Sequence, residues 1–476
     1  MNSEKNKKIS ALKTSIYEGG GFEVMSGFGT RYLSPFAVAL GAGNTFMSLF
    51  ATLPTLIAGL FQILTLKSFY DHSRKKVVMF SVAAQIIFWL PLVFCASLFY
   101  YDKISVSLSL IILFLSYTLL SIFGALASPS WNSWMRDLVP KKSGNYFGKR
   151  TAIIGTIGII SMVIGGIILD FFKKSSPNKL MIGFSVIFII AIIGRSVSLS
   201  FFRKQYEPKH KSYKSSYFSF FSFIKNIEKH GNNFGKFSVF IGIFGLGVAI
   251  ASPFFSVYML KDIGFSNSYL SYTIISIVSL ASIMAFSPSW GRIIDKHGNV
   301  AVMKFCSIGI AFVPLLWAFS FMIYNNFGFS VTAAYLFFIE IFTGFVWGGY
   351  NLSSAVFIYE AVTKEKMALC VAYNGIIGAA GAVIGSIIGR IMMNYSGPIP
   401  ILGNVNYFVF VFLISFVARL TIAIFFSSTF KEVRKVKKAS LNLKDVQEAA
   451  LYPLTIIKKY TNNHQWSLFH PPWKAI

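Results

Sequence analysis

The stretch VVMFSVAAQIIFWLPLVFCASLF occupies residues 77–99 and contains no charged residue. A helix needs about 20 apolar residues to cross the hydrocarbon core of a bilayer, so this stretch is long enough for one crossing. The whole chain has the same character, because 55% of its 476 residues are hydrophobic and 13% are charged. A soluble fold of this size could not bury so much apolar surface, which excludes an ordinary soluble protein.

Apolar segments of similar length recur along the chain, and we predict twelve transmembrane helices. The first is the most polar, because it contains Glu18, Glu23 and Arg31. The fold class expected is therefore an all-α polytopic membrane protein. The predicted spans are 17–41, 43–66, 77–99, 104–127, 150–171, 180–202, 236–260, 268–289, 301–323, 330–355, 367–393 and 405–427.

The basic residues are distributed unequally between the two sides of these spans. The chain has 44 Lys+Arg against 17 Asp+Glu, a net charge of +27. With an even number of crossings both termini lie on one side, and 35 of the 44 fall there, against five in the opposite loops. Basic loops mark the cytoplasmic side and suit an anionic inner leaflet. We therefore expect a multi-pass protein of the cell membrane with both termini cytoplasmic and no nucleic-acid partner.

The two halves of the sequence match each other at an offset of about 224 residues. Each half has six predicted spans, so the halves share one orientation, as in transporters built from parallel repeats. The domains expected are residues 1–202, a cytoplasmic linker at 203–235, residues 236–428, and a basic tail at 429–476. The matched pairs are Tyr70-Asp71-His72 with Ile294-Asp295-Lys296, Asp137 with Glu360, and Arg195 with Arg419. Ser34-Pro35-Phe36 also matches Ser252-Pro253-Phe254, at a shorter offset of 218.

The loop after the second span of each half carries a motif. The second half reads Gly291-Arg292-Ile293-Ile294-Asp295-Lys296-His297-Gly298, which resembles the G-x-x-x-D-[RK]-x-G-[RK] loop of the major facilitator superfamily. The first half keeps Asp71 and the basic Arg74 but lacks both glycines. The resemblance implies two six-helix bundles related by pseudo-twofold symmetry, which expose a central site to alternate sides. It makes these loops gating elements, with Asp71, Arg74, Gly291, Arg292, Asp295 and Gly298 as gating residues.

Ionisable residues inside a span are costly, so each is a functional candidate. The resemblance implies that the first, fourth, seventh and tenth spans line the cavity, which places Arg31 and Glu340 near it. They could pair with each other or face a substrate. We expect Arg31 to bind an anionic or polar group and Glu340 or Glu23 to couple transport to protons. A structural ion pair is the equal alternative. Further substrate candidates are Tyr32, Trp347 and Asn351.

Other residues have competing interpretations. Arg195 and Arg419 occupy equivalent places in spans six and twelve, which the resemblance places outside the cavity, so we interpret both as scaffold. Trp131 and Trp134 suit either an interfacial aromatic belt or the cavity floor. Glycines at three- and four-residue spacing in span eleven predict close helix packing. Matched prolines predict bends in spans one and seven. These glycines and prolines are Gly375, Gly378, Gly381, Gly385, Gly389, Pro35 and Pro253.

Several classes of chemistry have no support in the sequence. The six histidines fall in loops or tails, the three cysteines lie in apolar stretches, and no Walker-type phosphate loop occurs. We therefore expect no metal, no cofactor and no ATP-driven pump. A membrane enzyme would need a nucleophile or acid-base cluster near one membrane face, which we do not find. The function predicted is a monomeric secondary transporter of a small solute. A transporter-like sensor or receptor without net transport is the alternative.

Overall fold

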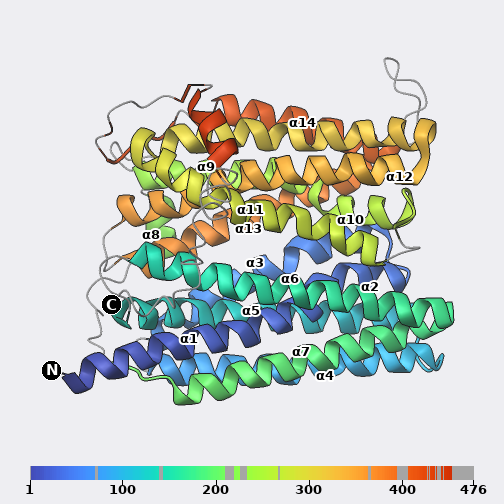
Figure 1. Ribbon diagram of the computed structural model, residues 1–476, viewed down its shortest axis with the longest axis horizontal. Coiled ribbons are helices and arrows are strands. Elements are labelled where there is room, and N and C mark those ends of the chain that lie inside the picture. The colour runs from blue at the N-terminus through green and yellow to red at the C-terminus, as the bar shows by residue number, and fades with distance from the viewer. Residues whose placement is uncertain are drawn as a thin grey trace, which may run out of the picture.

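The computed structural model is all-helical over the residues that it describes, with no strand among them. Figure 1 shows long helices lying side by side, and the helix that begins at Asn2 starts at one face of the molecule. We call this the terminal face and the other end the opposite face. The described residues are 2–69, 73–138, 143–208, 219–225, 233–265, 269–362, 366–393, 406–425, 427, 429–434, 436, 441–442 and 444–452.

The first half forms the N-terminal bundle. Its helices pack as α4 against α5 and α7, α1 against α6 and α7, and α3 against α5. All lie together in the lower part of Figure 1. The elements are α1 (Asn2–Phe28), η1 (Thr30–Tyr32), α2 (Leu33–Ala39), α3 (Asn44–Phe69), α4 (Arg74–Tyr100), α5 (Val106–Leu138), α6 (Ser143–Ser175), η2 (Pro177–Lys179) and α7 (Leu180–Lys204).

The second half forms the C-terminal bundle, which begins after a six-residue linker helix, α8 (Phe220–Lys225). Within it α11 packs against α12, α13 against α9, and α14 against α12 and α9. The bundles meet where α13 contacts α3 and α11 contacts α6. The elements are α9 (Asn233–Ala249), α10 (Ser252–Lys261), α11 (Tyr269–His297), α12 (Asn299–Ala361), α13 (Met367–Met392) and α14 (Tyr407–Phe425).

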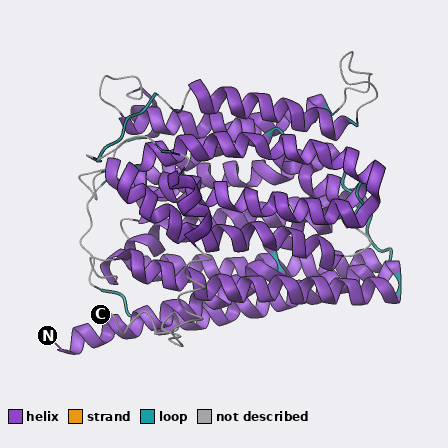
Figure 2. Cartoon of the chain, turned by 45° about the horizontal axis from the view of Figure 1, so that its top comes forward, coloured by secondary structure: helices purple, strands orange, loops and turns teal. Residues whose placement is uncertain are grey.

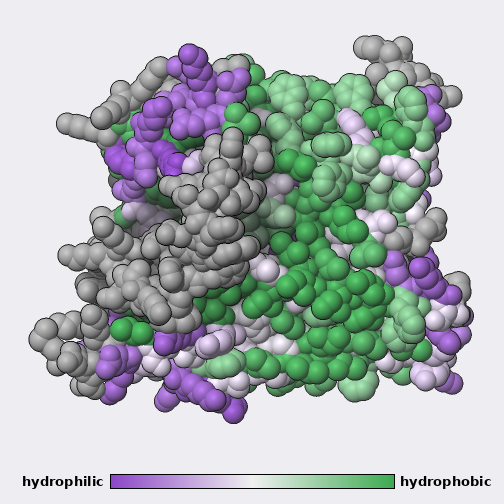
Figure 3. Space-filling model, in the orientation of Figure 1, coloured by the Kyte–Doolittle hydropathy of each residue, from purple (hydrophilic) through white to green (hydrophobic). Residues whose placement is uncertain are grey.

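The outer surface between the two faces is hydrophobic. Figure 3 shows apolar residues across the middle of the molecule and hydrophilic residues toward both faces. Large side chains such as Phe80, Phe94 and Phe338 are more than half exposed. In water that exposure would be unfavourable, whereas lipid solvates it, and helices satisfy their own backbone groups there. The helical ribbons in Figure 2 run through this whole band, as a multi-pass membrane protein requires.

Ten segments of the described chain are long and apolar enough to cross a membrane. The longest is the 63-residue α12, which has non-helical backbone at Gly328 (φ 75°, ψ −170°) and so contains two helices of the expected pattern. The first expected span, residues 17–41, is not among the ten, because α1 is too polar and η1 and α2 are too short. The α1 helix also begins at Asn2, well before the predicted start. The count of twelve crossings stays a prediction.

Two of the helices that pass through the bundles are interrupted at matching places. The first helix breaks at Gly29, where an added Cβ would contact Met25 O and the Trp89 ring. The seventh breaks at Ile250 and Ala251, between α9 and α10. Pro35 and Pro253 lie in the first turns that follow the two breaks. Proline cannot donate to the carbonyl four residues earlier, so the predicted bends are confirmed as helix breaks.

Glycines let α13 approach α9 closely. A Cβ at Gly381, Gly385 or Gly389 would meet the carbonyl oxygens of Gly242, Leu246 and Ile250 respectively. The regular spacing places these three glycines on one face of α13, and without side chains the two backbones come into contact. Gly375 in the same helix has nothing within 4 Å of such a Cβ. The predicted close packing is therefore confirmed for Gly381, Gly385 and Gly389.

Candidate functional site

A cavity of about 250 Å³ lies within the C-terminal bundle. Its walls come from the broken seventh helix, α11, α12 and α14, and aromatic side chains cover much of them. Most of the lining is apolar, with a few polar groups, which is the composition of small-molecule sites. The lining residues are Val248, Ser252, Phe255, Ser256, Met259, Tyr272, Ile275, Ser276, Val313, Trp317, Glu340, Thr343, Trp347 and Arg419.

Glu340 places a carboxylate in this cavity. It lies in the second half of α12, and the side chains of Ser279 and Trp317 are its hydrogen-bond donors. In the described chain no basic side chain forms an ion pair with it. One turn further along, the Thr343 hydroxyl is buried without a hydrogen-bond partner, in a residue that is 8% exposed. A buried hydroxyl without a partner is unfavourable, so a ligand or water at this place would satisfy it.

Arg419 combines a structural role with a place in the cavity wall. Its guanidinium donates to Gly247 O (3.4 Å), Val248 O (3.0 Å) and Ile310 O (3.3 Å). Gly247 and Val248 belong to the last turn of α9, where the helix breaks and the regular hydrogen bonds to residues four positions later end. Ser415 Oγ (2.8 Å) and the backbone N–H of Ala251 (3.3 Å) are the other donors to these two oxygens. The scaffold role is thus observed, but the placement outside the cavity was wrong. Nothing in the sequence indicates this contact, because Arg419 and Gly247 are 172 residues apart.

The structure separates the candidates of the first helix from Glu340. Arg31 lies in η1 with an exposed side chain, and in the described chain no ion pair joins it to Glu340. Its nearest acidic neighbour is Glu23, which also lies near Arg150. The predicted pairing of Arg31 with Glu340 is therefore absent from this structure.

Three further candidates have different surroundings. Tyr32 is 1% exposed, and its hydroxyl donates to Met162 O (2.5 Å) and lies 2.8 Å from Thr273 Oγ1. It joins the two bundles instead of facing the cavity. Trp347 lines the cavity, whereas Asn351 is exposed and does not.

A buried ion pair in the N-terminal bundle is a feature that the sequence interpretation missed. Arg150 Nη2 lies 2.9 Å from Glu18 Oε1, and Trp131 Nε1 donates to the same oxygen at 3.1 Å. The Arg150 guanidinium also covers the Trp131 ring at 4.9 Å from its centroid. Glu18 is 3% exposed, so the charge is buried and compensated. Trp131 thus donates to a buried carboxylate, a contact that neither the belt nor the cavity-floor interpretation included.

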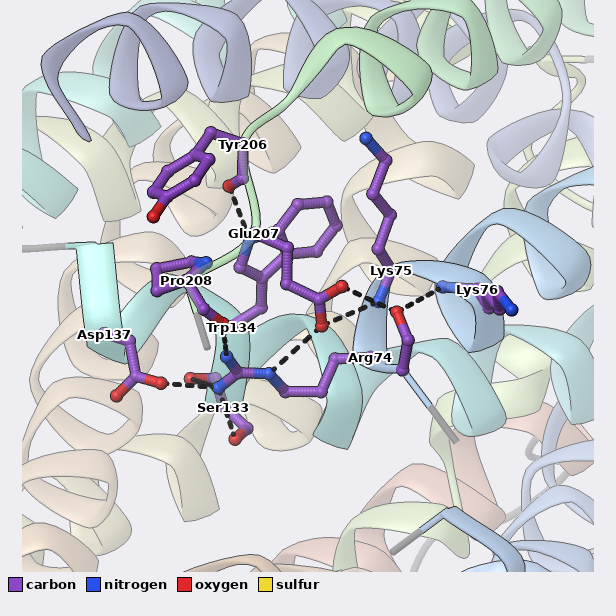
Figure 4. Close-up of polar contacts among 10 residues, drawn as sticks. Arg74, Lys75, Lys76, Ser133, Trp134, Asp137, Tyr206, Glu207 and Pro208 are labelled. Carbon is purple, nitrogen blue, oxygen red and sulfur yellow. Dashed lines mark hydrogen bonds and ion pairs between the residues drawn. The ribbon is translucent and has the colours of Figure 1, made fainter. Parts of the chain in front are cut away.

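The gating loop of the N-terminal bundle is organised around Arg74, as Figure 4 shows. Its guanidinium lies 2.6 Å from Asp137 Oδ2 and 3.5 Å from Glu207 Oε1, and it donates to Ser133 O and Pro208 O. The Arg74 side chain is 5% exposed. These partners come from the end of α5 and from the segment after α7, so Arg74 ties three parts of the terminal face together.

The tryptophan next to this cluster is also structural. Trp134 is 0% exposed and donates through Nε1 to Tyr206 O at 2.9 Å (Figure 4). It packs against Phe202 with ring centroids 6.1 Å apart. Neither proposed location, the interfacial belt or the cavity floor, describes it. Asp71, the predicted gating acid of this loop, lies outside the described residues.

The gating loop of the C-terminal bundle is held by the chain after α14. Arg434 Nη1 lies 3.3 Å from Asp295 Oδ1 and 3.8 Å from Glu360 Oε1, and Arg434 Nη2 donates to Ile294 O at 2.7 Å. Gly298 has φ of 91°, a conformation that L side chains rarely adopt, so glycine suits this turn. The predicted gating acid Asp295 thus pairs with the chain that follows its own bundle.

The basic tail adds further contacts to the same loop. Asp445, in a helix at residues 444–452, lies 2.8 Å from Lys296 Nζ and 3.1 Å from His297 Nε2. The Arg292 guanidinium stacks on the Tyr452 ring, 3.7 Å from its centroid. At Gly291 an added Cβ would have only Leu352 within 4 Å, so this glycine is not needed for close packing.

In the part of the chain that the structure describes, no three His, Cys, Asp or Glu residues come together as a metal site would require. Cys95, Cys306 and Cys370 are buried and free there. The cavity itself offers a carboxylate, hydroxyls and aromatic rings as binding groups.

Comparison with known proteins places this arrangement in context. A family model described as "Major Facilitator Superfamily" matches residues 22–351 and 237–475. The multi-drug resistance efflux pump PmrA of Streptococcus pneumoniae is 24% identical over 227 residues, which are 45% of this chain and 50% of that protein. The chain thus matches about half the length of this curated relative.

Solved structures show the same fold. The inward open conformation of the xylose transporter XylE from E. coli superposes with a TM-score of 0.61 at 13% identity, over 94% of this chain and 99% of that one. The nucleoside transporter NupG superposes with a TM-score of 0.58 at 16% identity, over 90% of this chain and 99% of that one.

Proposed function

The chain belongs to the Major Facilitator Superfamily, and on that premise we propose that its solute binds in the cavity beside Glu340 and crosses the membrane by alternating access. The transporter folds of similar shape support a transporter of a small solute. The single observation that carries the site is a carboxylate inside an aromatic cavity, close to the unpaired Thr343 hydroxyl.

The lining favours a solute that has a positive charge on an apolar body. Trp317, Trp347, Phe255 and Tyr272 offer ring faces, which attract cations as well as apolar groups. The Arg419 guanidinium is engaged by carbonyl oxygens and by Ser415 Oγ, at 3.0 Å. The Glu340 carboxylate can still accept hydrogen bonds from a solute, because a carboxylate accepts about four hydrogen bonds and only the side chains of Ser279 and Trp317 donate to it among the described residues.

The same carboxylate supports a proposal of proton coupling. A carboxyl group inside a bundle with no basic partner can carry a proton through the membrane. If a cationic group of the solute also binds there, solute and proton exclude each other from one site. The proposed outcome is exchange of solute for protons. Arg31 and Glu23 would line the path on the side of the N-terminal bundle and orient polar groups of the solute.

The proposed orientation has both termini in the cytoplasm of a cell whose plasma membrane holds the protein. The support is the excess of Lys+Arg in the loops on the terminal side, 35 against five. A working monomer is part of the proposal, since residues of one bundle are enough to line the cavity.

Reconstituted vesicles test the proposal. Proteoliposomes with a trapped pH-sensitive dye would be exposed to xylose, uridine or ethidium, one probe for each kind of solute transporter found among the relatives. We expect ethidium to release protons from acid-loaded vesicles, and Glu340→Gln to reduce this flux at least tenfold. Asp102→Asn is the matched control, because Asp102 is exposed in a loop and Asn tolerates its φ of 52°.

The outcomes separate the alternatives. Proton-linked flux that survives Glu340→Gln at the normal rate contradicts the assigned role of Glu340. Flux of xylose or uridine without ethidium flux contradicts the preference for a cationic solute but not the transporter. Saturable ethidium binding in equilibrium dialysis with no flux of any probe favours the receptor that performs no transport.

A further inference from the structure

The start of α11 is held by the N-terminal bundle at the opposite face. The backbone N–H of Tyr269 donates to Asp170 Oδ1 at 2.5 Å, and that of Leu270 donates to Asp170 Oδ2 at 3.2 Å. Asp170 lies near the end of α6, so both bonds cross from one bundle to the other. The first N–H groups of a helix have no intrahelical partner and carry partial positive charge, which a carboxylate stabilises.

The neighbouring contacts hold the same turn of α11. Gly166, one turn before Asp170, leaves no room for a side chain, because a Cβ there would lie 2.9 Å from Thr273 Oγ1 and 3.3 Å from Leu270 Cα. The Tyr32 hydroxyl reaches Thr273 Oγ1 at 2.8 Å. Three positions of one helical turn are therefore bound by the other bundle: two backbone N–H groups by Asp170 and a side chain by Tyr32.

A second contact occupies the equivalent place in the repeat. Arg390, near the end of α13, donates through Nε to Thr45 Oγ1 at the start of α3. Thr45 and Tyr269 are 224 residues apart, which is the offset of the internal repeat. Lys261 Nζ also donates to Ala42 O at 3.1 Å across the same seam. The start of α3 carries partial positive charge, which does not stabilise the positive Arg390. The start of α11 does stabilise the negative Asp170, so the Asp170 contact is the stronger of these two contacts.

We propose that Asp170 is the latch that keeps the opposite face closed, by capping α11 of the other bundle. The inference rests on the alternating-access function proposed above. When the bundles separate at this face, both backbone bonds of Asp170 must break, and the start of α11 loses its cap. The closed state is favoured over the open one by the free energy of this cap, and solute binding must offset it during transport.

Spin-label distances test the latch without any solute. Labels at Asn178 in η2 and Asn326 in α12 would report the separation of the bundles at the opposite face, because both residues are exposed there. We expect the unmodified protein to populate mainly the short distance. Asp170→Asn should raise the share of the long distance about 2- to 30-fold, which corresponds to a helix-terminus charge effect. Asp170→Glu, which keeps the carboxylate, should retain the short distance.

Two further variants make the test decisive. Gly166→Ala should open the same face, because its Cβ pushes α6 away from α11, and it serves if Asp170→Asn does not fold. Asp102→Asn, an exposed acid on the same face, should leave the distances unchanged. Distances in Asp170→Asn and Gly166→Ala that match the unmodified protein overturn the latch. If the distances shift as expected while vesicles show no solute flux, the latch stands and the proposed function fails.

Discussion

Glu207 and Glu432 occupy the same place in the two bundles, and each caps the helix that follows its gating loop. Glu207 accepts from the backbone N–H of Lys75 at 3.4 Å, and Glu432 accepts from that of Val300 at 2.9 Å. Both hydrogen bonds span 132 residues and end on the second residue of a helix, α4 or α12. The internal repeat is thus present in three-dimensional contacts as well as in sequence.

Removing either cap should destabilise its own bundle. Glu207→Ala or Glu432→Ala should lower the free energy of unfolding in mixed micelles by about 0.5–2 kcal/mol, the range for loss of a helix cap. We expect the larger effect for Glu432, whose bond to Val300 N is shorter. Because the two sites lie in different bundles, the double variant should show the sum of the two effects. Glu448→Ala, on an exposed part of the tail helix, is the control, and an equal loss there would contradict the capping role.

Arg419 should be required for the break in the seventh helix. In Arg419→Met the carbonyls of Gly247 and Val248 lose the charged donor, at roughly 1.5–3 kcal/mol for each hydrogen bond to a charged group. Ser415 Oγ and the Ala251 N–H remain as their donors. We expect a loss of about 2–4 kcal/mol in the free energy of unfolding. Arg419→Lys should recover little of it, because one ammonium group cannot reach the carbonyls of Gly247, Val248 and Ile310 together. Full recovery by lysine would mean that charge alone matters.

Two glycines of one helix should respond oppositely to the same substitution. Gly381→Ala places a Cβ on the Gly242 carbonyl and must push α13 from α9, so we expect a loss of about 1–3 kcal/mol in the free energy of unfolding. Gly375→Ala meets nothing within 4 Å and should be neutral or stabilising by up to about 1 kcal/mol, from helix propensity. Thermal unfolding followed by tryptophan fluorescence compares the two. Equal melting temperatures would rule out the proposed backbone contact.

The tail helix at residues 444–452 should detach from the gating loop in acid. The Lys296 ammonium, followed by the Asn442 backbone N–H, holds the pKa of Asp445 below its ordinary value. A lowered pKa means that docking favours the carboxylate, so its contribution is complete above about pH 4 and is lost as the pH falls further. His297 and Glu448 are the other titratable groups near Asp445 and Lys296.

A nitroxide at Leu451, which is exposed, would measure this detachment as an increased mobile fraction between pH 7 and pH 3. Asp445→Asn should be mobile at every pH, and Glu448→Gln should behave like the unmodified chain. A mobile fraction that does not change with pH, or a docked Asp445→Asn, would exclude Asp445 as the anchor of the tail.

Much of the fold follows from local sequence. Helices such as α4 and α7 begin and end within a few residues of the limits that the apolar stretches predict. The reason is that about 20 consecutive apolar residues match the thickness of the hydrocarbon core of a bilayer. The turn after α11 could be located because Gly298 belongs to a short local motif, while the gating role of both loops stays a prediction. The first helix was predicted least well, since Glu18, Glu23 and Arg31 hide its apolar pattern.

The candidate site was predicted only in part. Glu340 and Trp347 line the cavity as expected. For Glu340 the reason is that an ionisable side chain within a span is unfavourable in lipid and so faces the interior of a bundle. Tyr32 and Asn351 do not, and Arg419 lines the cavity against expectation. Whether a residue faces the cavity, a neighbouring helix or lipid depends on how its helix is rotated, and apolar residues on all faces leave little periodicity from which to read that rotation.

The sequence by itself determined that this chain is a membrane protein, where its helices lie, which loops share a side, and that its halves repeat. These properties depend on composition and spacing over a few tens of residues, because apolar length decides which segments enter the bilayer and loop charge decides their orientation. Only the tertiary structure decided that Asp170 caps α11, that Arg419 supports the break at Ile250 and Ala251, and that Glu18 pairs with Arg150. Each of these contacts joins residues about 100 or more positions apart, so packing of the helices alone brings them together.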